Sequence, residues 1–147
     1  MEEVSPEDIY KSEGERQIAG LLDRVGIAYR YEYPLAMVDR GKVRIWYPDF
    51  QLPEYGMVVE CVGMRGDRRY NAQLEHKRRA YAEMGIPVVF VTPESFRGYW
   101  PRRVMGSIER ILKERVNAFE QKNRGLPDWQ EKKEMGASAQ RESGVYA

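Results

Sequence analysis

The alternation of apolar and polar positions predicts helices and strands in a definite order along this chain. Apolar residues recur at helical spacing in SEGERQIAGLLDRVG, where Ser12 suits an N-cap and Gly26 ends the helix. Two further stretches, 69–84 and 101–122, have the same period. Strands are predicted where residues alternate or form a short apolar run, namely over 27–35, 42–52, 57–63 and 86–92. The order αβββαβ, followed by a C-terminal helix, predicts an α/β fold with a mixed central sheet flanked by helices.

The pattern also sets the expected extent of the folded domain. Periodicity ends near Asn123, so we expect one domain over residues 10–122 and a flexible C-terminal tail over 123–147. The 147 residues are 42% hydrophobic and 32% charged, which is the composition of an ordinary soluble protein. The longest apolar run, IPVVFV, is too short to cross a bilayer, and the acidic amino terminus does not resemble a secretion signal. We therefore expect a cytoplasmic protein without a membrane partner.

Charge is distributed unevenly although the net charge is only +1. The stretch MRGDRRYNAQLEHKRR, residues 64–79, carries six arginines or lysines against Asp67 and Glu75. A local basic patch of this kind binds phosphates even when the whole chain is nearly neutral. A solvated helix face is the simpler explanation of the same residues. Both interpretations stay open at this point.

Four charged residues are predicted to point toward the core. Glu15 and Lys77 fall on the apolar stripes of the first and second helices. Glu60 interrupts the run MVVECV, and Asp49 follows Pro48 in an alternating segment. The strand face assigned to Asp49 also carries Val43, Ile45 and Tyr47. A structural salt bridge would explain any one of these charges, whereas acids that converge with a lysine form a site for a hard divalent cation.

These residues resemble the PD-(D/E)XK nuclease superfamily, which has the restriction-endonuclease-like fold. The resemblance rests on Glu15 in the first helix, the pair Pro48–Asp49, and Glu60 in the following strand, and it covers about residues 12–97. It implies an αβββαβ core, with the C-terminal helix as an addition. The usual motif has a lysine two residues after the second acid, where this chain has Val62. Variants of the fold carry that lysine on the next helix, and Lys77 fits this migration.

The resemblance implies a Mg²⁺-dependent endonuclease that hydrolyses DNA phosphodiester bonds, with Mn²⁺ as a substitute. Asp49, Glu60 and the backbone carbonyl of Cys61 would hold the ion. Lys77 would orient the attacking water and stabilise charge in the transition state. Glu15 would hold an outer water or a second ion. DNA contacts are expected from the basic segment, namely from Arg65, Arg68, Arg69, Tyr70, Gln73 and Arg78.

A second class of function stays open. Because Val62 replaces the motif lysine, the chain would also suit a catalytically degenerate module that binds nucleic acid or a protein partner. Whether it acts alone or as a homodimer is equally open, although a pair of such cores cuts both DNA strands most easily. The phosphate-binding patterns GxxxxGK[ST] and GxGxxG are absent, so we expect no nucleotide cofactor. With one histidine, His76, and one cysteine, Cys61, a His-ligated or Cys-rich zinc site is not expected.

Overall fold

The computed structural model describes residues 9–63 and 67–124 of the chain. The elements are α2 (Glu13–Val25), β1 (Arg30–Tyr31), β2 (Leu35–Asp39), β3 (Lys42–Trp46), β4 (Phe50–Leu52), β5 (Met57–Cys61), α3 (Arg68–Glu83), β6 (Val88–Val91), the 3₁₀ helix η1 (Pro93–Phe96) and α4 (Trp100–Lys122). The chain divides into two compact units, Met1–Leu112 and Lys113–Ala147, and all strands belong to the first. No helix in the described ranges is long and apolar enough to cross a membrane.

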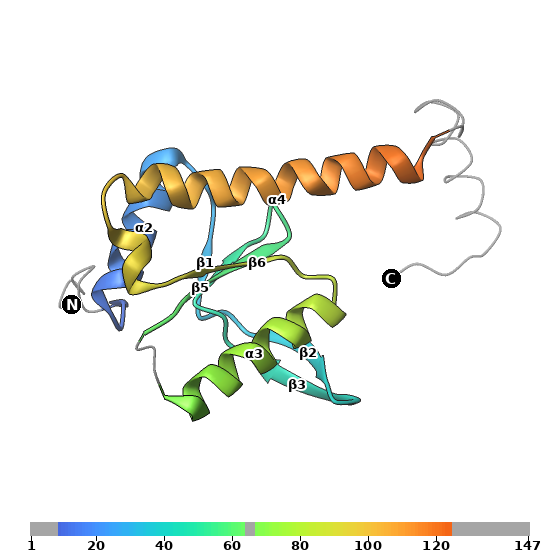
Figure 1. Ribbon diagram of the computed structural model, residues 1–147, viewed down its shortest axis with the longest axis horizontal. Coiled ribbons are helices and arrows are strands. Elements are labelled where there is room, and N and C mark those ends of the chain that lie inside the picture. Colours follow the sequence, from blue (N-terminus) through green and yellow to red (C-terminus); the bar gives the residue numbers. More distant parts are fainter. Residues whose placement is uncertain (1–8, 64–66, 125–147) are drawn as a thin grey trace, which may run out of the picture. The chain divides into compact units, whose positions relative to one another are not determined.

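The central sheet contains four strands in the order β1-β4-β5-β6. The pairs β1–β4 and β4–β5 are antiparallel, whereas β5 and β6 are parallel. Parallel neighbours need a crossover connection, which α3 provides here. The predicted α/β class with a mixed sheet flanked by helices is confirmed (Figure 1).

Two of the predicted strands are wrong in their extent. The segment 27–35 contributes only Arg30–Tyr31 to the central sheet, because Glu32 has a φ of 47° and ends the extended backbone. The segment 42–52 is interrupted between Trp46 and Phe50, where the chain contains Pro48. Proline lacks the N–H that a ladder requires, so the sheet continues only beyond it.

The residues on either side of Arg40 and Gly41 form a separate two-stranded sheet, the β2–β3 hairpin. Arg40 and Gly41 have φ values of 51° and 75°, as a two-residue type I′ turn requires. Met37 points inward and is fully buried, whereas Val43 and Ile45 on the opposite face are 75% and 53% exposed. The predicted inward face of this segment is therefore wrong for Val43 and Ile45, and also for Tyr47, which is 63% exposed.

The sheet packs between helices on both faces. On one face, α2 and α4 cover Val59 with a core that includes Ile18, Leu22 and Ile108. The hairpin and α3 lie on the other face (Figure 1), where Val58 packs with Met37, Ala80 and Tyr81. Alternation along β5 therefore divides its side chains between two cores.

The helix ends follow the sequence signals. The Ser12 hydroxyl accepts a hydrogen bond from the Glu15 backbone N–H at 3.2 Å, and Gly26 adopts a φ of 74° after the last residue of α2. Both predicted ends of the first helix are confirmed. The apolar stripe of the last helix is confirmed for Val104 and Ile108, which are buried, whereas its continuation at Val116 and Phe119 is exposed.

Replacing the buried anchor of the hairpin should destabilise the protein markedly. We expect Met37→Ala to lower the free energy of unfolding by about 2–5 kcal/mol, because Met37 is fully buried and alanine leaves a cavity. Urea unfolding followed by circular dichroism measures this change. The matched variant Val43→Thr, on the exposed face, should stay within about 0.5 kcal/mol of the wild type. Equal effects of the two variants would contradict the assignment of the hairpin faces.

Candidate active site

Glu60 is a buried carboxylate between the central sheet and α3. It lies on β5 and is 5% exposed, on the same strand face as Val58. The Tyr81 hydroxyl donates a hydrogen bond to Glu60 Oε1 at 2.7 Å. The Lys77 ammonium lies 3.5 Å from Glu60 Oε2. Lys77 and Tyr81 are one turn apart on α3, so this helix supplies a partner to each oxygen of the carboxylate.

Asp49 lies beside Glu60 because of the strand register. Phe50 pairs with Val59 in the antiparallel ladder, so the preceding residue, Asp49, comes next to Glu60. The Cys61 backbone N–H donates to Asp49 Oδ2 at 2.7 Å. The half-buried carboxylate of Asp49 is thereby fixed to the strand that carries Glu60.

The two acids repel each other in a partly desolvated environment. Burial, and then the negative charge of Glu60, raise the pKa of Asp49 to about 7. Glu15 adds to this rise, whereas the Cys61 N–H bond and the Lys77 ammonium oppose it. The three acids and the lysine therefore share one electrostatic environment. Negative charge exceeds positive charge in it, which favours the entry of a cation.

Glu15 is held at the other side of this environment. It is 6% exposed, and its Oε2 accepts hydrogen bonds from the Lys11 backbone N–H at 2.8 Å and from the Tyr31 hydroxyl at 2.6 Å. The predicted burial of Glu15 in the stripe of the first helix is confirmed. Its hydrogen bonds connect the start of α2 with β1, while its charge acts on Asp49.

Cys61 presents its backbone rather than its thiol to the acids. Its side chain packs against the core formed by α2 and α4. Burial, and then the charge of Asp49, raise the pKa of the thiol well above its usual range. A protonated thiol is a poor nucleophile, so the Cys61 side chain contributes packing rather than chemistry.

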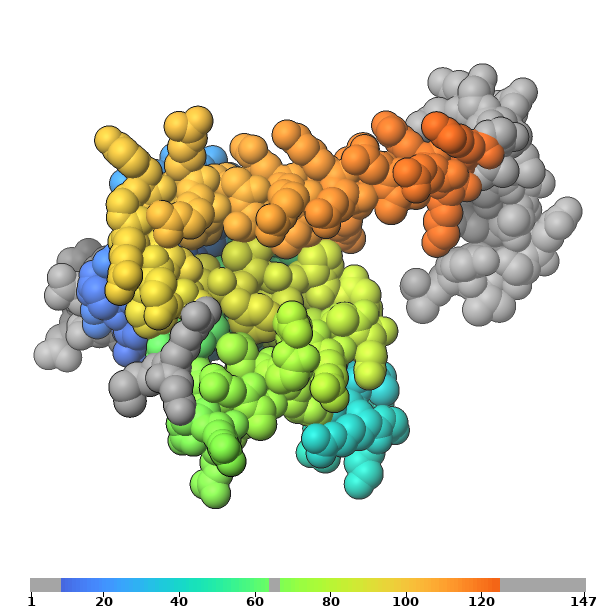
Figure 2. All heavy atoms as spheres, in the orientation of Figure 1, coloured from blue at the N-terminus to red at the C-terminus, as the bar shows by residue number. Residues whose placement is uncertain are grey.

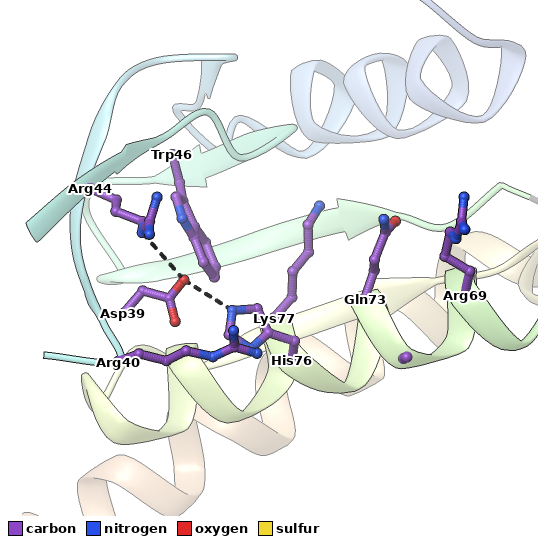
Figure 3. Close-up of a pocket in the computed structure, with 9 residues that line it drawn as sticks. Asp39, Arg40, Arg44, Trp46, Arg69, Gln73, His76 and Lys77 are labelled. Atoms are coloured by element: carbon purple, nitrogen blue, oxygen red, sulfur yellow. Dashed lines mark hydrogen bonds and ion pairs between the residues drawn. The ribbon is translucent and has the colours of Figure 1, made fainter. Parts of the chain in front are cut away.

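Some residues of the basic segment face a groove beside this site. Arg69, Gln73 and Lys77 lie in a row along α3 and line a cavity of about 570 Å³ (Figure 3). Their spacing of four residues places them on one helix face. Tyr70 has a different position, because its hydroxyl accepts a hydrogen bond from the Gly63 backbone N–H at 2.8 Å. Tyr70 thus joins α3 to the segment that follows β5.

Of the remaining residues predicted to contact DNA, those that the structure describes do not line this groove. Arg68 is exposed at the start of α3. Arg78 is exposed and forms an ion pair with Glu75 at 2.9 Å. Arg65 lies outside the described residues. The basic segment therefore divides into residues that line the groove and residues on the open surface of the helix.

The sequence did not predict the part that the hairpin plays. Arg40, Arg44 and Trp46 form the wall of the groove opposite α3 (Figure 3). The contact of Tyr81 with Glu60 was also missed. A usable signal existed for Tyr81, which follows Lys77 by four residues on the same stripe. No comparable signal existed for the hairpin, because its strands were assigned to the central sheet.

Two carboxylates suffice for a magnesium site, because Mg²⁺ keeps several waters and takes one or two protein carboxylates. Asp49 and Glu60 supply such a pair, and the raised pKa of Asp49 reflects negative charge that a cation would neutralise. Among residues 9–63 and 67–124, no group of three or more histidine, cysteine, aspartate or glutamate side chains is arranged to hold a metal ion. The residues present fit Mg²⁺ with a largely hydrated shell rather than an all-protein cage.

Comparisons with protein-family models, with curated proteins and with solved structures gave no match to this chain.

The shifted pKa of Asp49 predicts a pH-dependent stability. The carboxyl loses its proton at about pH 7 in the folded chain but near its usual 3.8 when unfolded, so the folded state binds the extra proton between these values. In EDTA, wild type should therefore lose stability relative to Asp49→Asn as pH rises from about 4 to about 7. We expect a change on the order of 1–2 kcal/mol after solvent screening.

Urea unfolding of both proteins at pH 5 and pH 8 measures this difference. Mg²⁺ should raise the unfolding midpoint of wild type at pH 8 and leave that of Asp49→Asn nearly unchanged, since a ligand of the folded state stabilises it. Glu54→Gln, at an exposed carboxyl, is the control and should follow the wild-type profile. If the stability of wild type and of Asp49→Asn changes with pH in the same way, the raised pKa assigned to Asp49 is wrong.

Proposed function

We propose that this chain is a metal-dependent endonuclease of the PD-(D/E)XK type, which hydrolyses DNA phosphodiester bonds. The observation that supports it best is the position of Lys77, whose ammonium lies 3.5 Å from Glu60 Oε2. Asp49 is fixed next to that pair by its hydrogen bond from the Cys61 backbone. Two acids and an amine from separate elements thus converge beside a groove lined by cations.

Asp49 and Glu60, with the backbone carbonyl of Cys61, would hold Mg²⁺, or Mn²⁺ in its place. The ion would polarise the phosphate and lower the pKa of a bound water. Lys77 is 47% exposed at its side chain, so its ammonium reaches both Glu60 and a substrate in the groove. There it would orient the attacking water and offset negative charge that develops on the phosphate. Glu15 would bind an outer water.

The position of Lys77 supports the proposal that the motif lysine has migrated. Glu60 lies on the β5 face that packs with α3, and Val62 follows two residues later, just past the end of the strand. Val62 is buried. Lys77 reaches the Glu60 carboxylate from that helix. An amine on α3 would thus occupy the role that the usual motif gives to position 62.

A degenerate nucleic-acid-binding module is the second candidate. The observation that favours it is the cationic groove, which would bind phosphates whether or not chemistry follows. In that case Lys77 and Glu60 would be a structural ion pair. The two candidates differ in cleavage, so activity assays distinguish them.

Removing either metal-binding acid should abolish cleavage without unfolding the protein. We expect Asp49→Ala and Glu60→Ala to leave no measurable Mg²⁺-dependent conversion of supercoiled plasmid, because each removes half of the carboxylate pair. Asp49→Ala should be at least as stable as wild type in EDTA, since it relieves repulsion between the acids. Glu109→Ala, an exposed acid on α4, should cut at the wild-type rate. Wild-type cleavage by Asp49→Ala would make the metal assignment wrong.

Lys77→Ala should lower the cleavage rate by roughly 10²–10³-fold, the usual effect of losing one preorganised electrostatic group. Single-turnover cleavage of a labelled DNA substrate measures the rate, and binding in EDTA should change much less because other cations remain in the groove. Arg110→Ala on α4 is the control of equal charge change and should cut normally.

The variant Val62→Lys on the Lys77→Ala background tests the migration directly. It returns an amine to the usual motif position, so we expect part of the lost rate to return. If Lys77→Ala weakens binding and leaves the rate of the bound complex intact, Lys77 belongs to the groove alone and the degenerate module becomes the better description.

A further inference from the structure

The groove beside the candidate active site has two walls of different origin. The β2–β3 hairpin supplies Arg40, Arg44 and Trp46, and α3 supplies Arg69 and Lys77 (Figure 3). Hairpin and helix lie side by side on the surface of the molecule (Figure 2). The volume of about 570 Å³ is within the range of about 300–1,000 Å³ that is usual for ligand clefts.

Polar contacts join the two walls. His76 Nε2 of α3 lies 3.0 Å from Asp39 Oδ2 of the hairpin. Arg44 Nε lies 3.9 Å from the same oxygen, and Arg40 lies 3.5 Å from His76 Nδ1. The side chain of Asp39 is only 12% exposed, whereas that of Arg44 is 57% exposed. Asp39, the one acid among the described residues that line the groove, is thus enclosed by its partners, and the arginines present excess positive charge to the solvent.

An aromatic ring lies among these cations. Trp46 lines the groove and is half-buried, and its ring meets that of Tyr81 edge-on at 5.4 Å. The Tyr81 hydroxyl also donates a hydrogen bond to Glu60, so Trp46 is connected to the candidate active site through Tyr81. Cationic side chains with an aromatic ring are the pattern by which proteins hold single-stranded nucleic acids, since phosphates bind the charges and bases stack on the ring.

The row along α3 connects the groove to the acids. Arg69, Gln73 and Lys77 follow one another at intervals of four residues on one helix face. Lys77, the last of the row, contacts both the groove and Glu60. A strand that lies along this row therefore brings a phosphodiester to the carboxylates.

We infer that this groove binds a single-stranded segment of DNA, with Arg40 and Arg44 of the hairpin contacting phosphates and Trp46 stacking against a base. The inference rests on the proposed function, because it takes DNA as the substrate and adds which form of DNA reaches the acids. A hollow with a wall on each side suits a single strand, whereas elements that bind duplex DNA project into its grooves. The substrate class is then DNA with an unpaired segment, such as a flap, a gap or a frayed end.

Fluorescence anisotropy in EDTA tests the binding separately from cleavage. The probes are a fluorescein-labelled single-stranded oligonucleotide and the blunt duplex of the same sequence. Wild type should bind the single strand more tightly than the duplex. Arg40→Gln/Arg44→Gln should bind the single strand roughly tenfold less tightly, and the slope of log K against log salt should fall by about 1.4, from about 0.7 for each lost phosphate contact.

The matched control is Arg102→Ala/Arg110→Ala, which removes two exposed charges from α4 and should bind as wild type does. Thermal unfolding checks that each variant folds. Arg69→Gln removes a groove charge from the opposite wall and should weaken binding even if the hairpin variant is unstable. Single-stranded DNA should also quench tryptophan fluorescence in wild type, and Trp46→Phe should lose that quenching although the other two tryptophans remain.

The outcomes separate this inference from the proposed function. If wild type cuts DNA with Mg²⁺ but the hairpin variant and Arg69→Gln bind the single strand as wild type does, the inference fails and the nuclease stands. Tighter binding of the blunt duplex, or full quenching in Trp46→Phe, would likewise overturn it. If the variants lose single-strand binding while wild type cuts no DNA, the inference that the groove binds single-stranded DNA is supported and the nuclease proposal fails.

Discussion

The burial of one carboxylate, Glu60, constrains most of this structure. A charged group on a central strand costs several kcal/mol unless partners replace its water. Those partners come from α3, where Tyr81 donates a hydrogen bond and Lys77 supplies an ammonium. The helix therefore has to cross β5 at the height of Glu60. Tyr81 in turn packs against Met37, so the placement of the hairpin follows from the same requirement.

The two faces of β5 pack against different parts of the protein. Val59 and Cys61 complete an apolar core with α2 and α4, and this core contains most of the buried apolar side chains in residues 9–63 and 67–124. The opposite face holds a smaller core around Val58 and the carboxylate of Glu60. Acids that repel one another, as the raised pKa of Asp49 indicates, are tolerated because the larger core lies behind them. The larger apolar core and the buried charge of Glu60 thus lie on opposite faces of β5.

The sequence predicted the helices and the buried acids well because their signals are local. Ser12 and Gly26 mark the ends of α2 through cap geometry alone, and Glu15 follows from helical period. The prediction for the hairpin was wrong for a different reason. Alternation in 42–46 shows that β3 has two faces, but period two cannot tell which face is buried. Met37 and Trp46 pack inward with Arg44 on their side, so Val43 and Ile45 point to solvent.

The row of residues at four-residue spacing on α3 shows how one helix links binding, chemistry and packing. Arg69, Gln73 and Lys77 are exposed, whereas Tyr81, one turn beyond Lys77, is 1% exposed. A phosphate contact is useful only in solvent, and a hydrogen bond that fixes Glu60 is strongest where water is excluded. Lys77 lies where these two requirements meet. That position lets its ammonium keep the ion pair with Glu60 and still reach the groove.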